Sequence, residues 1–118
     1  MSAIDQELIC KVNLLLERHP GSVTRLCTTV AHNRAIGGAE KSYHLTGEAV
    51  DLVFDRHASL LLAARYARDL GFLGIEVDFR NNHLHLDLRK VKWEVVYTTE
   101  KKYTLTEYLA LDTLPPSV

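Results

Sequence analysis

The sequence has little of several features that would each indicate a particular class of protein. Only two of its 118 residues are cysteines, and because they form no C-x-x-C pair, no disulfide framework is indicated. No apolar run approaches the roughly 20 residues of a membrane-spanning helix. The formal net charge is −1, and a solvated surface accounts for the lysines that come nearest to a basic cluster: Lys90, Lys92, Lys101 and Lys102. We therefore expect neither a nucleic-acid partner nor a membrane partner.

The two cysteines are expected to be buried thiols, Cys10 on the apolar face of a helix and Cys27 in an apolar strand. The sequence leaves a disulfide between them open. Residues 1–5 lack a basic segment followed by an apolar one, so no signal peptide is predicted there. We accordingly expect the chain to be cytoplasmic as synthesised.

Length and hydrophobic patterning predict one domain that spans residues 1–118. Helical spacing of apolar residues predicts an N-terminal helix that ends at His19-Pro20-Gly21, and a second helix over 58–70 that ends at Gly71. The residues of the second helix that are expected to face inward are Leu61, Leu62, Ala64, Ala67 and Leu70. Strands are predicted over 22–28, 48–54, 72–79, 83–89 and 93–98, an irregular loop over 31–47, and a short helix at 104–112. These elements predict an α+β fold, with a small, mostly antiparallel sheet and helices packed on one side.

Histidines and carboxylates gather in two segments of the chain. Residues 83–88 alternate strictly, so His83, His85 and Asp87 share one strand face and three leucines share the other. Asp51 lies in an otherwise apolar strand, where an unpaired carboxylate would be costly, and His44 ends the loop before it. A structural Asp–His pair would account for Asp51 by itself. Together, however, the imidazoles and the carboxylate are the donors that zinc prefers, and they predict a zinc pocket.

The two segments resemble the zinc D-alanyl-D-alanine carboxypeptidase family, which shares its fold with the amino-terminal signalling domain of Hedgehog. The signature of that family is S-x-H-x-x-G-x-A-x-D, followed by H-x-H or a near variant. The first segment, HNRAIGGAEKSYHLTGEAVD at 32–51, matches every fixed position, and HLHLDLR at 83–89 supplies the second motif. The matching residues are Ser42, His44, Gly47, Ala49 and Asp51, and Trp93 also fits. The resemblance covers roughly residues 22–95.

The resemblance implies that one zinc ion is bound by His44, Asp51 and His85. Three protein ligands leave a fourth position for water, which is typical of catalytic zinc sites. By the same resemblance, His83 would stand beside the metal and hydrogen-bond the substrate or the tetrahedral intermediate. Asp87 could orient an imidazole from the same strand face.

Two further residues are implied to bind substrate. Ser42 would bond a ligand or the substrate, although a serine there could equally cap a turn. The family often has an arginine just before the H-N-R stretch, where this chain has Thr28, and Arg34 or Arg25 could substitute for it.

The sequence departs from the family at the general base. A Glu or Asp commonly stands three residues before the last ligand, but here that residue is Asn82, which cannot take a proton. A two-residue turn at 81–82 would place Asp78 opposite His85, where its carboxylate could hold the attacking water. A loop one residue longer would turn Asp78 away. Asp78 is therefore the candidate base on condition of that register.

The resemblance implies zinc-dependent hydrolysis of peptide bonds in peptidoglycan, of the D-Ala-D-Ala carboxypeptidase or murein endopeptidase type. The expected partner is a peptidoglycan peptide, and the expected protein is a monomer. Release to the cell wall, as for a phage lysin, would bring a cytoplasmic product to this substrate. Asn82 favours the alternative, a zinc-stabilised binding module without hydrolysis. A metal-free interaction domain is the third possibility, in which the polar residues of the two motifs would need other partners.

Overall fold

The structure is a computed structural model, and it describes residues 6–25 and 48–111 of the chain. The described helices are α1 (Gln6–Arg18), α3 (His57–Asp69) and α4 (Leu105–Ala110). The described strands are β1 (Ser22–Arg25), β2 (Ala49–Val53), β3 (Gly74–Asp78), β4 (His83–Asp87), β5 (Trp93–Tyr97) and β6 (Lys102–Thr104). The helices and strands predicted at these places are confirmed, and β6 is a strand that was not predicted from the sequence. The predicted loop at 31–47 lies outside the described residues.

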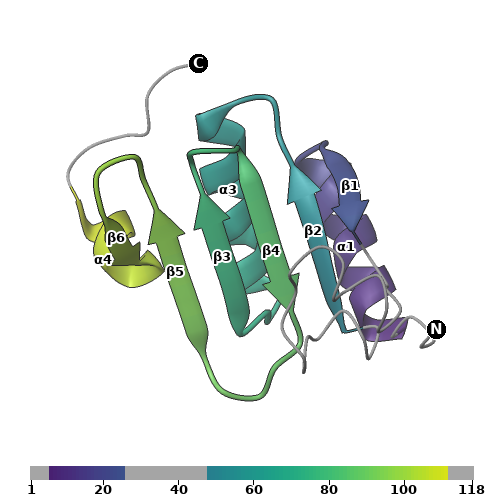
Figure 1. Cartoon of the computed structure of the whole chain (residues 1–118). Coiled ribbons are helices and arrows are strands. Elements are labelled where there is room, and N and C mark those ends of the chain that lie inside the picture. The colour runs from purple at the N-terminus through teal and green to yellow at the C-terminus, as the bar shows by residue number, and fades with distance from the viewer. Residues whose placement is uncertain (1–5, 26–47, 112–118) are drawn as a thin grey trace, which may run out of the picture.

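The six described strands form one sheet in the order β1-β2-β4-β3-β5-β6 (Figure 1). Four of its pairings are antiparallel, and β3 pairs with β5 in parallel. The α+β class is confirmed, with a sheet that is mixed rather than wholly antiparallel. Strand β2, which carries the end of the first motif with Asp51, and strand β4, which carries the H-x-H of the second, are neighbours in the sheet.

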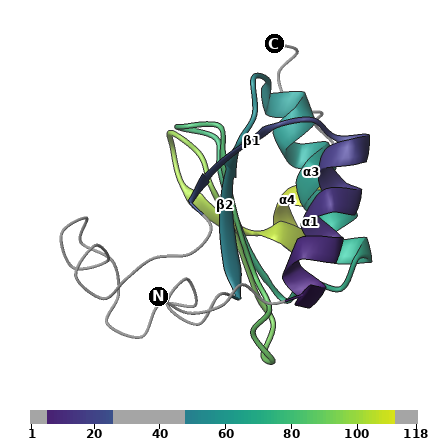
Figure 2. The same cartoon turned by 90° about the vertical axis from the view of Figure 1, so that its right-hand side faces the viewer.

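The helices pack on one face of the sheet, as Figure 2 shows in profile. The core between the layers contains Leu8 and Leu15 of α1, Leu60 of α3, and Leu84 and Leu86 of β4, all with no exposed surface. Burying side chains of this size stabilises the fold by about 1.5–3 kcal/mol each. None of the helices in the described part of the chain is long and apolar enough to cross a membrane.

Two predictions about buried residues are wrong. The side of α3 that faces the core carries Leu60, Leu61, Ala63, Ala64 and Ala67, whereas Leu62 is 48% exposed. The inward stripe is therefore centred one residue earlier than the sequence suggested. Cys10 is also exposed, because it lies on the outer side of α1, between the core-facing positions Leu8 and Val12. Cys27 lies outside the described residues.

The local chemistry explains where two helices stop and start. Gly71 follows α3 with φ +96°, a left-handed conformation that glycine adopts without steric cost. The predicted short helix is α4, and Thr104 and Glu107 form its capping box. The Thr104 hydroxyl accepts a hydrogen bond from the Glu107 amide at 3.0 Å, and the Glu107 carboxylate accepts one from the Thr104 amide at 2.8 Å.

The β3–β4 hairpin differs from the two-residue turn that the sequence suggested. Asp78 pairs with His83, so residues 79–82 form a four-residue connection, and Asn82 takes a left-handed conformation with φ +52°. Asparagine tolerates this conformation better than most residues. The predicted register, which paired Asp78 with His85, is therefore wrong. The shift is by two residues, so Asp78 stays on the expected face but lies two pairs along the ladder from His85, and Glu76 is the residue opposite His85.

Candidate metal centre

Asp51 and His85 are paired at the centre of the sheet. They are direct partners in the antiparallel β2–β4 ladder. Their neighbours along each strand, Leu52 on β2 and Leu84 and Leu86 on β4, lie in the core under the helices. Since side chains alternate along a strand, Asp51 and His85 lie on the opposite face of the sheet, which none of the described helices covers (Figure 2). Asp51 thus lies on the same polar face as His83 and His85, whereas the first motif up to Gly47 lies outside the described residues.

The carboxylate of Asp51 is in contact with two imidazoles. Its Oδ1 atom lies 2.8 Å from His85 Nδ1 and 3.6 Å from His83 Nε2. Asp51 is only 8% exposed. A carboxylate this buried requires a partner, and here the partners are the histidines that the motif predicts to be near the metal.

The other nitrogen of His85 is held by a second carboxylate. His85 Nε2 lies 2.7 Å from Asp87 Oδ2, and Asp87 is fully buried. Arg89 donates to both oxygens of Asp87, from Nε at 2.7 Å and from Nη2 at 2.6 Å. The Arg89 guanidinium in turn lies 4.4 Å from the centre of the Trp93 ring. An arginine that binds both carboxylate oxygens fixes the carboxylate firmly, so the orientation of the His85 ring is fixed as well.

These contacts suit a zinc ligand. Histidines that bind zinc usually donate their second ring N–H to a carboxylate, and Asp87 provides that carboxylate on Nε2. His85 Nδ1 then remains for a metal shared with Asp51. Imidazole nitrogen and carboxylate oxygen are donors that zinc prefers, so the residues present fit the ion. Within residues 6–25 and 48–111 there is no complete group of three possible metal ligands, and the predicted third ligand, His44, lies outside those ranges.

The electrostatics of the metal-free site favour a protonated His85. Burial by itself would lower the pKa of His85, but the hydrogen bonds to Asp51 and Asp87 outweigh it and raise the pKa to about 9. Burial would likewise raise the pKa of Asp87, but the hydrogen bonds from Arg89 and His85 hold it well below its usual range. One proton thus occupies the position between Asp51 and His85 that a metal ion would take.

This proton predicts a pH dependence of the metal-free protein. Histidine has a pKa near 6.5 when unfolded and about 9 here, so folding stabilises the charged form. The stabilisation is complete below pH 6.5 and is lost as the pH rises through 9. The melting temperature of EDTA-treated protein should therefore fall between pH 6.5 and 9, and much less so in His85→Gln. A melting temperature that stays constant over this interval would contradict the Asp51–His85–Asp87 arrangement.

Gly74 leaves the space in which the Asp87–Arg89 pair sits. It is the partner of Asp87 in the β3–β4 ladder, and a Cβ atom at this position would overlap the Asp87 carboxylate and meet Arg89 Nε at 2.6 Å. Because Asp87 is fully buried and held on both oxygens, it has little freedom to move away.

Gly74→Ala should therefore destabilise the protein by about 1–3 kcal/mol and weaken zinc binding by about 10–100-fold. Urea denaturation and zinc competition titrations would measure the two effects. Gly71→Ala is the matched control, because its positive φ makes alanine unfavourable while its added Cβ would approach only Lys11. It should lower stability and leave the zinc affinity of the folded protein unchanged. Equal zinc affinities for the two variants would show that the contacts of Arg89 with Asp87, and of Asp87 with His85, do not support metal binding.

The remaining predicted site residues have different outcomes. His44, Ser42 and Arg34 lie outside the described residues, so their roles stay predictions. His83 lies beside Asp51, on the same face as His85, as expected. Arg25, the other arginine that the sequence offered for substrate binding, is the partner of Asp51 in the β1–β2 ladder.

The geometry that made Asp78 the candidate base is not present. Its carboxylate accepts hydrogen bonds from Arg80 Nε at 2.8 Å and Nη2 at 2.9 Å, and from the Arg80 amide at 3.0 Å. The hydrogen bond from Arg80 is the main cause that lowers the pKa of Asp78. A carboxylate bound in this way is a weak proton acceptor, so Asp78 acts in the hairpin as the partner of Arg80.

Three residues around the site were not identified as important from the sequence. Glu76 lies directly opposite His85, Arg89 holds Asp87, and Gly74 makes room for that pair. Alternation along 74–78 could have placed Glu76 on the polar face, but only the correct turn length puts it opposite His85. The spacing D-x-R was the available indication that Arg89 binds Asp87, since residues two apart in a strand share a face.

Comparison with known protein families identifies the family of the chain. The family profile described as Peptidase M15 matches residues 9–87, which run from α1 to the end of β4 and include both motifs. No curated protein matches the sequence. The match spans most of the chain and includes the ladder that joins Asp51 to His85. The chain therefore belongs to the peptidase M15 family of metallopeptidases, whose members typically depend on zinc.

Proposed function

We propose that this protein hydrolyses peptide bonds in the stem or cross-link peptides of peptidoglycan, as a zinc-dependent D-Ala-D-Ala carboxypeptidase or murein endopeptidase. The observation that carries the proposal is the Asp51–His85 pair on the open face of the sheet, with His85 fixed from behind by Asp87 and Arg89. A buried His–carboxylate arrangement of this kind, in a metallopeptidase family, is what a catalytic zinc site requires.

The metal would be held by Asp51, by Nδ1 of His85 and by His44. Bound zinc supplies Lewis acidity, which activates a water molecule near neutral pH and polarises the scissile carbonyl. Asp87 and Arg89 keep the His85 ring in one orientation. His83, whose Nε2 lies 3.6 Å from Asp51, is placed to donate a hydrogen bond to the oxygen of the carbonyl as negative charge develops there.

Glu76 is the carboxylate that takes the proton from the attacking water. Four carboxylates lie on the polar face of β2, β3 and β4: Asp51, Glu76, Asp78 and Asp87. Asp51 is assigned to the metal, Asp78 is bound by Arg80, and Asp87 is bound by Arg89 and has no exposed surface.

Glu76 is the one carboxylate of these four that is neither assigned to the metal nor bound by Arg80 or Arg89 through a described ion pair. It is half-buried on β3 and faces His85 across the ladder, where side chains approach within about 4.5–5.5 Å at Cβ. It therefore accepts the proton and returns it to the leaving amine.

The substrate lies outside the cytoplasmic membrane, so the enzyme reaches it after release to the cell wall, as a phage lysin does. It acts there as a monomer. The two hydrolase types differ only in which peptide bond is presented to the metal, and both use the same ligands and the same base.

Amine release from purified peptidoglycan tests the proposal. Zinc-loaded protein should generate new amino groups, EDTA-treated protein should not, and added zinc should restore the activity. Asp51→Ala should be inactive under all three conditions. If protein that carries zinc stoichiometrically releases no amine from peptidoglycan of several chemotypes, hydrolysis is excluded.

That outcome would favour the second candidate, a zinc-stabilised binding module of the same fold. The observation behind it is Asn82, which stands where the family commonly has its base. In the structure Asn82 forms the left-handed turn residue of the hairpin, and its carbonyl accepts a hydrogen bond from the Phe54 amide at 3.0 Å. Its role is thus structural, and the base must come from another position.

A further inference from the structure

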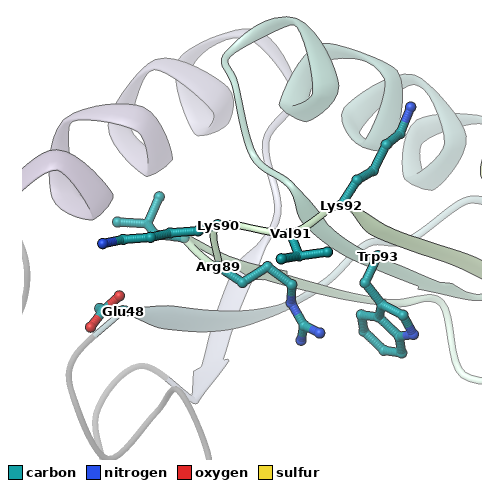
Figure 3. Close-up of a pocket in the computed structure, with 7 residues that line it drawn as sticks. Glu48, Arg89, Lys90, Val91, Lys92 and Trp93 are labelled. Carbon is teal, nitrogen blue, oxygen red and sulfur yellow. The ribbon is translucent and has the colours of Figure 1, made fainter.

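The connection between β4 and β5 concentrates positive charge beside the metal centre. Three of the four residues at 89–92 are basic, in a chain with a formal net charge of −1. A pocket of about 520 Å³ opens at this connection (Figure 3). Its described lining residues are the cations Arg89, Lys90 and Lys92, the apolar residues Leu88, Val91 and Trp93, and the acid Glu48. The volume lies within the range of pockets that hold small ligands.

The pocket shares a wall with the candidate metal site. The Trp93 ring meets the His85 ring edge-on, with centroids 6.4 Å apart. Arg89 lies 4.4 Å from the centre of the same Trp93 ring while it holds Asp87. A peptide that presents one bond at His85 would therefore reach the pocket with its next residues.

The three cations of the pocket differ in how far they are already paired. Arg89 is bound to both oxygens of Asp87. Lys92 lies 3.5 Å from Glu94. Lys90 is exposed and has no ion-pair partner among the described residues, and in Figure 3 it extends away from Trp93 toward the side of the pocket where Glu48 lies. Lys90 is thus the cation that can pair with a ligand.

The apolar part of the pocket is also open to a ligand. Val91 is 79% exposed, the largest exposure among the large apolar residues of the described chain. Trp93 and Leu88 complete the apolar lining. An ammonium on one side of the pocket and an aliphatic and aromatic surface on the other suit a short peptide segment that carries a carboxylate, rather than a fully polar polymer.

We propose that this pocket binds a carboxylate-bearing residue of the peptide substrate, next to the bond presented at His85. Lys90 pairs with the carboxylate, and the peptide packs against Trp93 and Val91. The identity of the peptide as a peptidoglycan stem rests on the proposed function, but binding in the pocket does not require hydrolysis. The preferred substrates are accordingly stem peptides with a free carboxylate rather than their amides.

Trp93 provides the measurement, because it is the only tryptophan in the chain. Its fluorescence should change when a stem tripeptide binds to zinc-loaded protein, and the same titration can be run in Glu76→Gln so that the peptide is not cut. We expect the tripeptide with a free carboxylate to bind about tenfold more tightly than its amide. Lys90→Ala should remove this difference, and Lys90→Arg should retain most of it.

Lys101→Ala is the matched control. Lys101 is an exposed lysine that packs on Tyr103, away from the residues that line the pocket, so its variant should keep the preference for the carboxylate. Equal binding of acid and amide, or a preference that survives in Lys90→Ala, would overturn the proposal. So would tight binding of poly(glycerol phosphate) without peptide binding, which would assign the pocket to a phosphate polymer.

The two proposals fail in different ways. If the carboxylate preference depends on Lys90 but no peptide is cut, carboxylate binding in the pocket is supported and hydrolysis is excluded. If acid and amide are cut equally well and Lys90→Ala has no effect, hydrolysis is supported and carboxylate binding in the pocket is excluded.

Discussion

Replacing Glu76 by Gln should lower kcat by about 10²–10⁴, the range that general acid–base catalysis typically supplies. Glutamine has nearly the same shape but cannot accept the proton of the attacking water. Glu76 lies opposite His85 and is half-buried on β3, which is paired on both sides in the sheet. The substitution should therefore leave the fold unchanged. Zinc content and melting temperature should stay close to those of the parent, and steady-state kinetics on a soluble muropeptide would measure the loss.

Asp78→Asn is the matched control for Glu76→Gln. Both substitutions remove one carboxylate from β3, on the same face and two residues apart. Asp78 is bound by Arg80, so its loss should weaken the hairpin and leave kcat within a few-fold of the parent. Asn82→Asp should have little effect or should raise activity by adding a carboxylate at the usual family position. A large loss in Asp78→Asn, with Glu76→Gln fully active, would return the base to Asp78.

Replacing Asp51 or His85 by Ala should abolish stoichiometric zinc binding. Each removes one of the three proposed ligands, and His85→Ala also leaves the buried Asp87 without its imidazole partner. Zinc in structural sites can contribute on the order of 10 kcal/mol to folding, so the variants should no longer gain stability from added zinc. Elemental analysis and melting curves with and without zinc would measure the two effects. Full zinc content in either variant would remove that residue from the ligand set.

His83→Ala separates a ligand from a residue that only stands beside the metal. His83 Nε2 lies 3.6 Å from Asp51, but Asp51 is paired with His85 in the ladder. The variant should keep its zinc and lose most of its activity, because the developing oxyanion loses a hydrogen bond. If His83→Ala loses zinc while His85→Ala retains it, the ligand has been assigned to the wrong histidine of the pair.

The arrangement of the site on the sheet could be predicted from the sequence because it depends on alternation alone. Residues 83–88 alternate between polar and leucine, and the leucines had to face the core. Asp51 in an apolar strand had to find a partner, and that partner is the imidazole across the ladder. Both inferences use short-range rules that hold whatever the rest of the fold does.

The choice of base could not be predicted because it depends on the length of a turn. The sequence Arg80-Asn81-Asn82 is compatible with a two-residue or a four-residue connection, and the two differ in which carboxylate faces His85. The preference of Asn82 for a left-handed conformation does not decide between them, since both turns use such a residue. The long pairing of β3 with both β4 and β5 fixes the register, and that pairing is not local in sequence.

The two errors of burial have a similar origin. Leu62 and Cys10 are apolar, and that character alone assigns both to inner faces. Their helices pack on the sheet through a narrower stripe, centred on Leu60 and Ala64 in α3 and on Leu8 and Leu15 in α1. The space that Gly74 leaves for Asp87 and Arg89 could not be predicted either, because that requires knowing which residue of β3 faces Asp87.

The placement of the metal tests the account most directly. Crystals of zinc-loaded protein, measured at the zinc absorption edge, should show one anomalous peak between Asp51 and Nδ1 of His85. It should lie about 2.0–2.2 Å from the carboxylate oxygen, from that nitrogen and from a nitrogen of His44, with Asp87 still bound to Nε2 of His85. No peak at this position in crystals that contain zinc, or a peak bound through His83 instead of His85, would contradict the proposed site.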